Sequence, residues 1–216
     1  MNTKKRNILI VVVIILIAAL VFFVLNNSPK EDKLNQLINK DIDTSSISVE
    51  VLPFSDDQLL TISQINNSQE IIDFINSNIS IKPQIDILTK QPSEVLSTME
   101  GNKSDVASLI NELLNRQGLY SSTILYAYIN NGEEYIDLII PFRDVDEPRY
   151  IYFEGNSINM MHHGWSYDEM FKAEEARASL SIESYCIMRH KVGYMEIAEC
   201  SSNDEVIRKH YFITED

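Results

Sequence analysis

Residues 101–118 read Gly-Asn-Lys-Ser-Asp-Val-Ala-Ser-Leu-Ile-Asn-Glu-Leu-Leu-Asn-Arg-Gln-Gly, and this stretch decides the fold. Asn102 is suited to cap a helix N-terminus, and Asp105 would place a negative charge in its first turn. Gly118 stands where a glycine commonly ends a helix. The stretch therefore predicts an amphipathic helix that packs on a core, because its apolar residues recur at the spacing of one helical face. These apolar residues are Val106, Leu109, Ile110, Leu113 and Leu114.

Together with its lead-in, Gln91-Pro92-Ser93-Glu94-Val95-Leu96, this helix resembles the nucleophile helix of transglutaminase-like proteins. In that family the helix opens with Gly-Asp-Cys-x-Asp, and Lys103 stands at the position of the cysteine. A thiol there is activated by the helix dipole and by a histidine that acts as general base. Lysine cannot take this role, because it brings a cation to the positive end of the dipole. The resemblance implies a papain-like core without its usual nucleophile.

The resemblance also indicates where the other two members of a catalytic triad would lie. The family's histidine is on the second strand, where this sequence has Glu134 or Tyr135, and its aspartate on the third strand corresponds to Glu154. A triad works as a unit, so replacing all three residues leaves no route to an acyl-enzyme. The resemblance covers roughly residues 67–156 and implies a domain that is not an enzyme of the usual kind.

The order of predicted elements indicates an α+β fold, with helices first and an antiparallel sheet after them. Asn130-Asn131-Gly132 is a favourable hairpin turn between two of the strands. Helices are predicted at 67–78, 102–118 and 167–178. Strands are predicted at 46–52, 123–129, 134–140, 149–153, 181–190, 194–199 and 210–214.

The N-terminal part predicts a membrane anchor. Residues 8–25 form an uninterrupted apolar run long enough to span a bilayer core. Basic residues in the tail, 1–7, favour a cytoplasmic N-terminus and an extracytoplasmic remainder. The run ends without the small residues of a signal-peptide cleavage site, which favours an uncleaved anchor. Residues 26–44 then read as a stalk, and 45–216 as the extracytoplasmic domain.

The composition argues against several classes of partner. The chain has 18 basic and 32 acidic residues, for a net charge of −14, so nucleic acid and anionic lipid headgroups are not expected partners. The acids do not have the spacing of a calcium loop, and no cofactor is predicted. The membrane is the expected partner of the anchor, and an envelope protein or peptide is the expected partner of the domain.

Cys186 and Cys200 are the chain's two cysteines, and each lies seven residues from Gly193 in the second predicted hairpin. This placement suggests that they face each other across two strands. In an oxidising exterior a disulfide is favoured over two free buried thiols. The alternative is a cysteine-dependent hydrolase or acyltransferase that uses Cys186 with His163 or His210.

His162 and His163 precede the chain's one tryptophan, Trp165, in the other conspicuous cluster. Adjacent histidines point to different sides of a strand or helix, so they make a poor chelating pair. Packing is the favoured interpretation. The alternative is a metal-binding or sensory ectodomain in which Asp168 or Glu169 supplies a third ligand.

Together these patterns predict a single-pass membrane protein that presents a degenerate transglutaminase-like domain outside the cell. Its expected role is binding or envelope structure. The relocated-thiol enzyme and the metal-binding ectodomain are the two alternatives.

Overall fold

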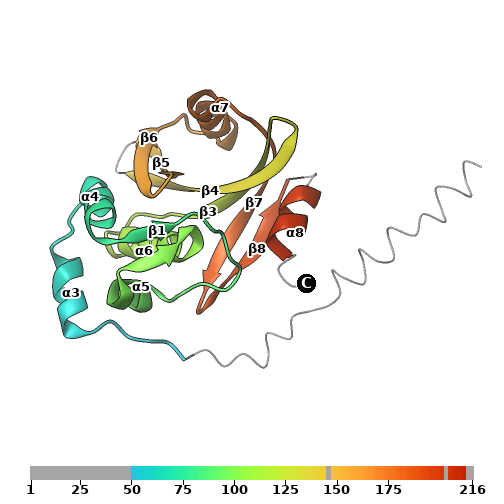
Figure 1. Cartoon of the computed structure of the whole chain (residues 1–216). Helices are drawn as coiled ribbons and strands as arrows, with labels where there is room; N and C mark the ends of the chain where they lie inside the picture. The colour runs from blue at the N-terminus through green and yellow to red at the C-terminus, as the bar shows by residue number, and fades with distance from the viewer. Residues whose placement is uncertain (1–49, 145–146, 202–203, 213–216) are drawn as a thin grey trace, which may run out of the picture. The chain divides into compact units, whose positions relative to one another are not determined.

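A six-stranded antiparallel sheet organises the chain (Figure 1). The structure is a computed structural model that describes residues 50–144, 147–201 and 204–212, which belong to the unit Val49–Asp216. The strand order is β6-β5-β4-β3-β7-β8, and each neighbouring pair is antiparallel. The strands are β3 (Thr123–Asn130), β4 (Glu133–Asp144), β5 (Glu147–Glu154), β6 (Ser157–His162), β7 (Ser181–Lys191) and β8 (Tyr194–Cys200).

Short helices and a small parallel sheet precede these strands. Ser55, Asn67 and Asn102 each cap a helix by accepting a hydrogen bond from a backbone N–H in its first turn. The second strand of the small sheet ends at Asn102, directly before the helix that Asn102 caps, and its pairing with the first strand fixes where that helix begins. The elements are α3 (Asp56–Ser63), α4 (Ser68–Asn78), β1 (Ser80–Lys82), α5 (Pro92–Thr98), β2 (Glu100–Asn102) and α6 (Lys103–Arg116).

The two faces of the large sheet bury different cores, because side chains alternate along each strand. One face packs against α6, and the opposite face packs against α7 (Tyr167–Ala178), as Figure 1 shows. On the α6 face the sheet contributes Leu125, Leu138, Ile140, Ile151 and Phe153. On the α7 face it contributes Ile124, Tyr126, Ile139 and Tyr150.

The α+β class and the antiparallel sheet are confirmed. The helix predicted at 67–78 is α4, the helix predicted at 167–178 is α7, and both hairpins are present. Asn131 and Gly132 have φ angles of 54° and 82°, as the predicted tight turn requires.

One predicted strand is wrong, and a second is not formed in the part that the structure describes. The segment predicted as a strand at 210–214 falls partly in helix α8 (Glu205–Phe212), which is anchored by the buried Ile207 and by an ion pair between Asp204 and Arg208 one turn apart. Within the predicted strand 46–52, the described residues 50–52 form no ladder. Side chains hold this backbone instead, because Gln91 and Ser93 bond to Glu50 and Leu52.

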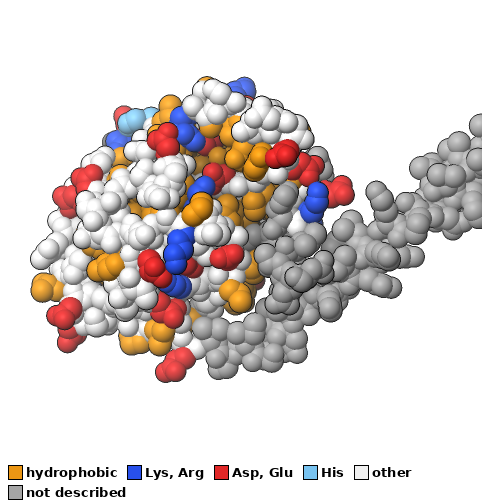
Figure 2. Space-filling view, viewed as in Figure 1, with side chains coloured by type: hydrophobic (Ala, Val, Ile, Leu, Met, Phe, Trp, Pro, Cys, Tyr) orange, Lys and Arg blue, Asp and Glu red, His pale blue; other side chains and the backbone are white. Residues whose placement is uncertain are grey.

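The predicted tail, anchor and stalk, residues 1–44, lie outside the described residues. Within the described ranges, no helix has the length and apolar character needed to cross a membrane. On the face drawn in Figure 2, acidic side chains are spread over the surface and several lie beside basic ones.

Candidate functional site

Lys103 forms a largely buried ion pair at the N-terminus of α6. Its Nζ donates to both carboxylate oxygens of Asp137 on β4, at 2.7 and 2.8 Å. The two side chains are only 12% and 18% exposed. Nζ also lies 5.7 Å from the centroid of the Phe153 ring on β5. The position that resembles a nucleophile therefore holds a cation that is already paired.

The sheet leaves Asp137 accessible to α6 because the ladder between β4 and β5 begins at Ile139 and Tyr152. Residues 133–138 of β4 pair with β3 and not with β5. In that stretch Asp137 stands opposite Tyr126 of β3. Burial raises the pKa of Asp137, and the charge and hydrogen bonds of Lys103 oppose that rise. Lys103 thus compensates a carboxylate that the fold has removed from water.

The three residues predicted to replace the family's histidine and aspartate do not reach Lys103. Glu134 pairs with Lys209 at 3.3 Å, and Tyr135 donates its hydroxyl to Glu133. Glu154 is exposed and accepts a hydrogen bond from Asn159. In the described structure these three residues therefore have partners other than Lys103. Asp137 was detectable as the one charged residue in the apolar run 136–142, since a charge inside such a run demands a partner.

A second set of polar groups lies behind Asp137, between the sheet and α7. Glu174 is fully buried and accepts a hydrogen bond from the Tyr126 hydroxyl at 2.9 Å. Arg177 donates two hydrogen bonds to Glu174, at 2.8 and 2.6 Å, and stacks on the Tyr152 ring at 3.9 Å. Burial, followed by the charges of Asp137 and Glu174, raises the pKa of Tyr126. Because these groups satisfy one another, the arrangement favours stability over catalysis.

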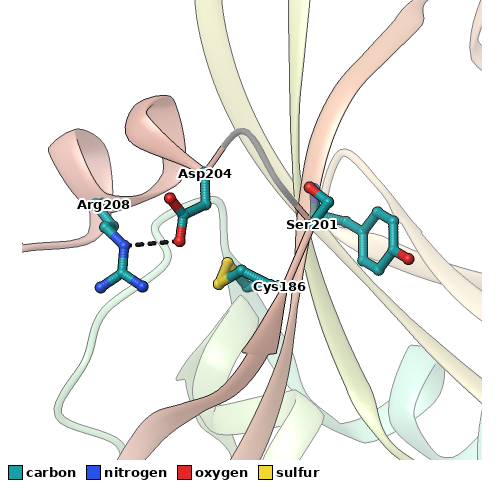
Figure 3. Close-up of a disulfide and its surroundings, with 6 residues drawn as sticks. Cys186, Ser201, Asp204 and Arg208 are labelled. Atoms are coloured by element: carbon teal, nitrogen blue, oxygen red, sulfur yellow. Dashed lines mark hydrogen bonds and ion pairs between the residues drawn. A yellow bond between two sulfur atoms is a disulfide. The ribbon is translucent and has the colours of Figure 1, made fainter.

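Cys186 and Cys200 form a disulfide between β7 and β8 (Figure 3), which is the pairing that their spacing favoured. The sulfur of Cys186 is therefore neither free nor exposed, and the chain's two cysteines leave no thiol nucleophile. Asp204 lies close to both sulfurs and pairs with Arg208 at 2.7 Å. Among the residues described, these two cysteines and Asp204 are the one group of three that could hold a metal ion. Sulfurs joined in a disulfide lack the thiolate that a metal requires.

Reducing the disulfide is expected to lower the free energy of unfolding by about 3 kcal/mol. The bond closes a loop between two cysteines that are 14 positions apart in the sequence. Urea unfolding with and without a phosphine reductant, followed by the fluorescence of Trp165, measures this difference. The variant Cys186→Ala/Cys200→Ala is the control and should not respond to the reductant. An equal response of both proteins would mean that the disulfide does not stabilise the domain.

The two histidines proposed as weak metal ligands point to different surroundings. His162 is exposed and its Nδ1 lies 3.0 Å from the Glu147 carboxylate. His163 packs beside the Tyr150 ring, and burial lowers its pKa. Glu169 accepts hydrogen bonds from the backbone and hydroxyl of Ser166 and thereby closes the capping box of α7. The described side chains thus bring neither Glu169 nor Asp168 together with both histidines.

A groove of about 1200 Å³ lies between residues 51–54, the second half of α6, and β7 with β8. A polar network forms part of its lining. The Thr123 hydroxyl lies 2.7 Å from Nε2 of His190 and accepts a hydrogen bond from Asn111. Asn111 in turn accepts from the Ser121 hydroxyl at 2.5 Å. Sequence reasoning missed this network, because its members are distant in sequence and carry no motif.

Burial sets the protonation of His190. The Thr123 hydroxyl can donate to Nε2 or accept from it, because its oxygen has two lone pairs and Asn111 uses one of them. Nδ1 is buried and has no hydrogen-bond partner in the described contacts. Burial lowers the pKa of His190 from 6.5 to about 4. His190 is therefore a neutral side chain at neutral pH.

His190 is expected to make the domain less stable as the pH falls from 6.5 to 4. In this window the unfolded chain binds a proton at His190 and the folded chain does not, so stability present above pH 6.5 is lost. The shift corresponds to about 3 kcal/mol. Urea unfolding at pH 7 and pH 4 should show a larger loss for the wild type than for His190→Gln. Equal losses in the two proteins would contradict this assignment.

Lys103 and the groove lie along one helix but are distinct, since Lys103 is the first residue of α6 and the groove is lined by Ser108 and residues beyond it. Among the described residues, no thiol or imidazole lies beside Lys103 at the N-terminus of α6, whereas the groove is an open cavity. No protein-family model matches the chain, and the curated proteins searched contain no match to it. The functional argument therefore depends on the geometry of these two places.

Proposed function

We propose that this chain is a single-pass membrane protein whose extracytoplasmic domain is a degenerate transglutaminase-like domain, and that it binds an envelope protein or peptide without catalysing a reaction. The order of helix α6, β3, β4 and β5 supports the resemblance, since a helix packs on an antiparallel sheet. The apolar run at 8–25 and the basic residues before it support the anchor and its orientation.

The observation that carries the proposal is the ion pair between Lys103 and Asp137. In a transglutaminase-like enzyme a thiol at the helix N-terminus and an imidazole on the sheet would meet there. Here an ammonium and a carboxylate meet at 2.7 Å, and neither is a nucleophile toward an acyl group while it is paired. The disulfide at Cys186 argues against a relocated thiol.

An alkylating probe tests the absence of covalent catalysis. The full chain in detergent is incubated with a peptide chloromethyl ketone, which alkylates activated thiols and imidazoles, and its intact mass is measured. We expect no adduct before or after reduction at neutral pH within the time that labels papain completely. Rapid stoichiometric labelling of any one residue would overturn the proposal.

A further inference from the structure

Two sulfurs and a carboxylate meet between the end of β8 and the start of α8. Cys186 on β7 stands directly opposite Cys200 on β8 in the strand register. One ligand atom from each of Cys186, Cys200 and Asp204 lies within 4.8 Å of the other two, and Figure 3 shows the Asp204 carboxylate beside the disulfide. Cys186 is buried and the other two residues are half-buried, so the group is largely shielded from water.

Contacts other than the disulfide also hold these three residues in place. The backbone N–H of Ser201 donates to the Tyr185 carbonyl at 2.9 Å, and its hydroxyl accepts from the Tyr185 N–H at 3.0 Å. The Asp204 carbonyl accepts from the backbone N–H of Arg208, whose guanidinium also binds the Asp204 carboxylate at 2.7 Å. Ile207 is fully buried and anchors α8. Breaking the sulfur–sulfur bond would therefore leave two thiols beside the same carboxylate.

Two thiolates and one carboxylate are a donor set that suits zinc. Zinc is bound tetrahedrally by Cys sulfur, His nitrogen and Asp or Glu oxygen, and three protein ligands commonly leave the fourth position to water. Thiolates favour zinc over calcium and magnesium, which prefer oxygen ligands. The hydrogen bond from Arg208 to Asp204 is the kind of outer contact that orients a ligating carboxylate.

The charges at this place match a divalent cation once the disulfide is reduced. Two thiolates and the Asp204 carboxylate carry three negative charges, of which the Arg208 guanidinium offsets one. A divalent cation neutralises the other two, which matters because charge beside the fully buried Cys186 must be compensated. In the disulfide form the sulfurs are uncharged, and Arg208 alone balances Asp204. The oxidation state of the sulfurs therefore decides whether a cation fits here.

We propose that Cys186, Cys200 and Asp204 form a zinc site when their disulfide is reduced. A dithiol reductant supplies two electrons and two protons and is itself oxidised to a disulfide, while the S–S bond of the chain breaks and two thiols form. Zinc binds both sulfurs as thiolates, releases their two protons to solvent, and takes the Asp204 carboxylate as its third protein ligand. Oxidation and zinc thus compete for the same two sulfurs. This site goes beyond the proposed binding role and does not depend on it.

Metal binding by the full chain in detergent tests this proposal. The chain is reduced with a phosphine, the phosphine is removed under anaerobic conditions, and Zn²⁺ is titrated against a colorimetric chelator. We expect the reduced chain to bind Zn²⁺ at least about tenfold more tightly than the disulfide form, which has no thiolate to offer. Co²⁺ in place of Zn²⁺ should give a sulfur-to-metal charge-transfer band, which reports the thiolate ligands directly.

The variant Asp204→Asn tests whether the carboxylate is a ligand. It keeps the size of the side chain and removes its charge, so the affinity of the reduced chain for Zn²⁺ should fall about tenfold. Glu199→Gln is the matched control, because Glu199 is exposed and strand alternation points it to the opposite face from Cys200. Its affinity should equal that of the wild type.

Concentrated urea separates a folded site from two cysteines that bind zinc in an unfolded chain. In urea the reduced wild type and Asp204→Asn should bind Zn²⁺ equally, because only the fold brings the carboxylate to the sulfurs. Equal affinity of these two proteins in native buffer would overturn the proposal. Zinc binding by the disulfide form as tight as by the reduced form would overturn it as well.

Discussion

Replacing Lys103 with methionine is expected to lower the free energy of unfolding by about 4 kcal/mol, because it leaves the Asp137 carboxylate buried and unpaired. Methionine keeps much of the apolar stem that lies near Phe153, so the loss reports mainly on the charge. The pKa of Asp137 should rise further in this variant. Its deficit relative to the wild type should therefore shrink at low pH, where Asp137 takes up a proton.

Two comparisons make this expectation specific. Lys82 pairs with Glu100 at 3.3 Å but is 54% exposed, so Lys82→Met should change stability by no more than about 0.5 kcal/mol. The double variant Lys103→Met/Asp137→Leu should recover most of the loss, since no uncompensated charge remains. Urea unfolding followed by Trp165 fluorescence measures all four proteins. A double variant as unstable as Lys103→Met would mean that the pair is not what stabilises this site.

Replacing Glu174 with alanine is expected to cost a similar amount, about 4 kcal/mol. The change removes the fully buried partner of Arg177 and the acceptor of the Tyr126 hydroxyl. Two polar groups between the sheet and α7 would then lose their hydrogen bonds at once. Glu174→Gln keeps the shape and one acceptor, so we expect a smaller loss.

The ion pair between Glu112 and Arg116 is a matched control for Glu174. Both pairs lie within one helix, but the Glu112 and Arg116 side chains are 32% and 39% exposed. Glu112→Ala should therefore change the free energy of unfolding by about 0.4 kcal/mol. Equal losses for Glu112→Ala and Glu174→Ala in urea unfolding would show that burial does not govern the strength of these pairs.

Local patterns were sufficient to predict much of the fold. The turn at Asn131 and Gly132 has the positive φ angles that its composition favours, and α6 begins at the cap that Asn102 predicts. Hydrophobic periodicity did not predict the conformation of segments that are short or that are held by residues distant in the sequence. Residues 50–52 are extended because Gln91 and Ser93 hold them, and no local pattern contains that information.

The candidate site was harder to predict than the fold, for a physical reason. Alternation places Asp137 on the α7 side of the sheet with Tyr126 and Ile139, and Lys103 reaches it where β4 no longer pairs with β5, a meeting that is decided by tertiary packing. The sequence therefore indicated Lys103 but not its partner, Asp137. The groove was missed because residues 51–54, α6 and β7 meet only in the folded chain.

We propose that Lys103 and Asp137 lie close enough for a thiol and an imidazole at these two positions to form a reactive pair. The most direct test is the thiol reactivity of Lys103→Cys/Asp137→His with iodoacetamide at pH 6, compared with glutathione in the same tube. We predict labelling at least tenfold faster than glutathione, because the helix N-terminus and the imidazole would lower the thiol pKa. Labelling no faster than glutathione, with a midpoint near pH 8.5, would contradict this proposal.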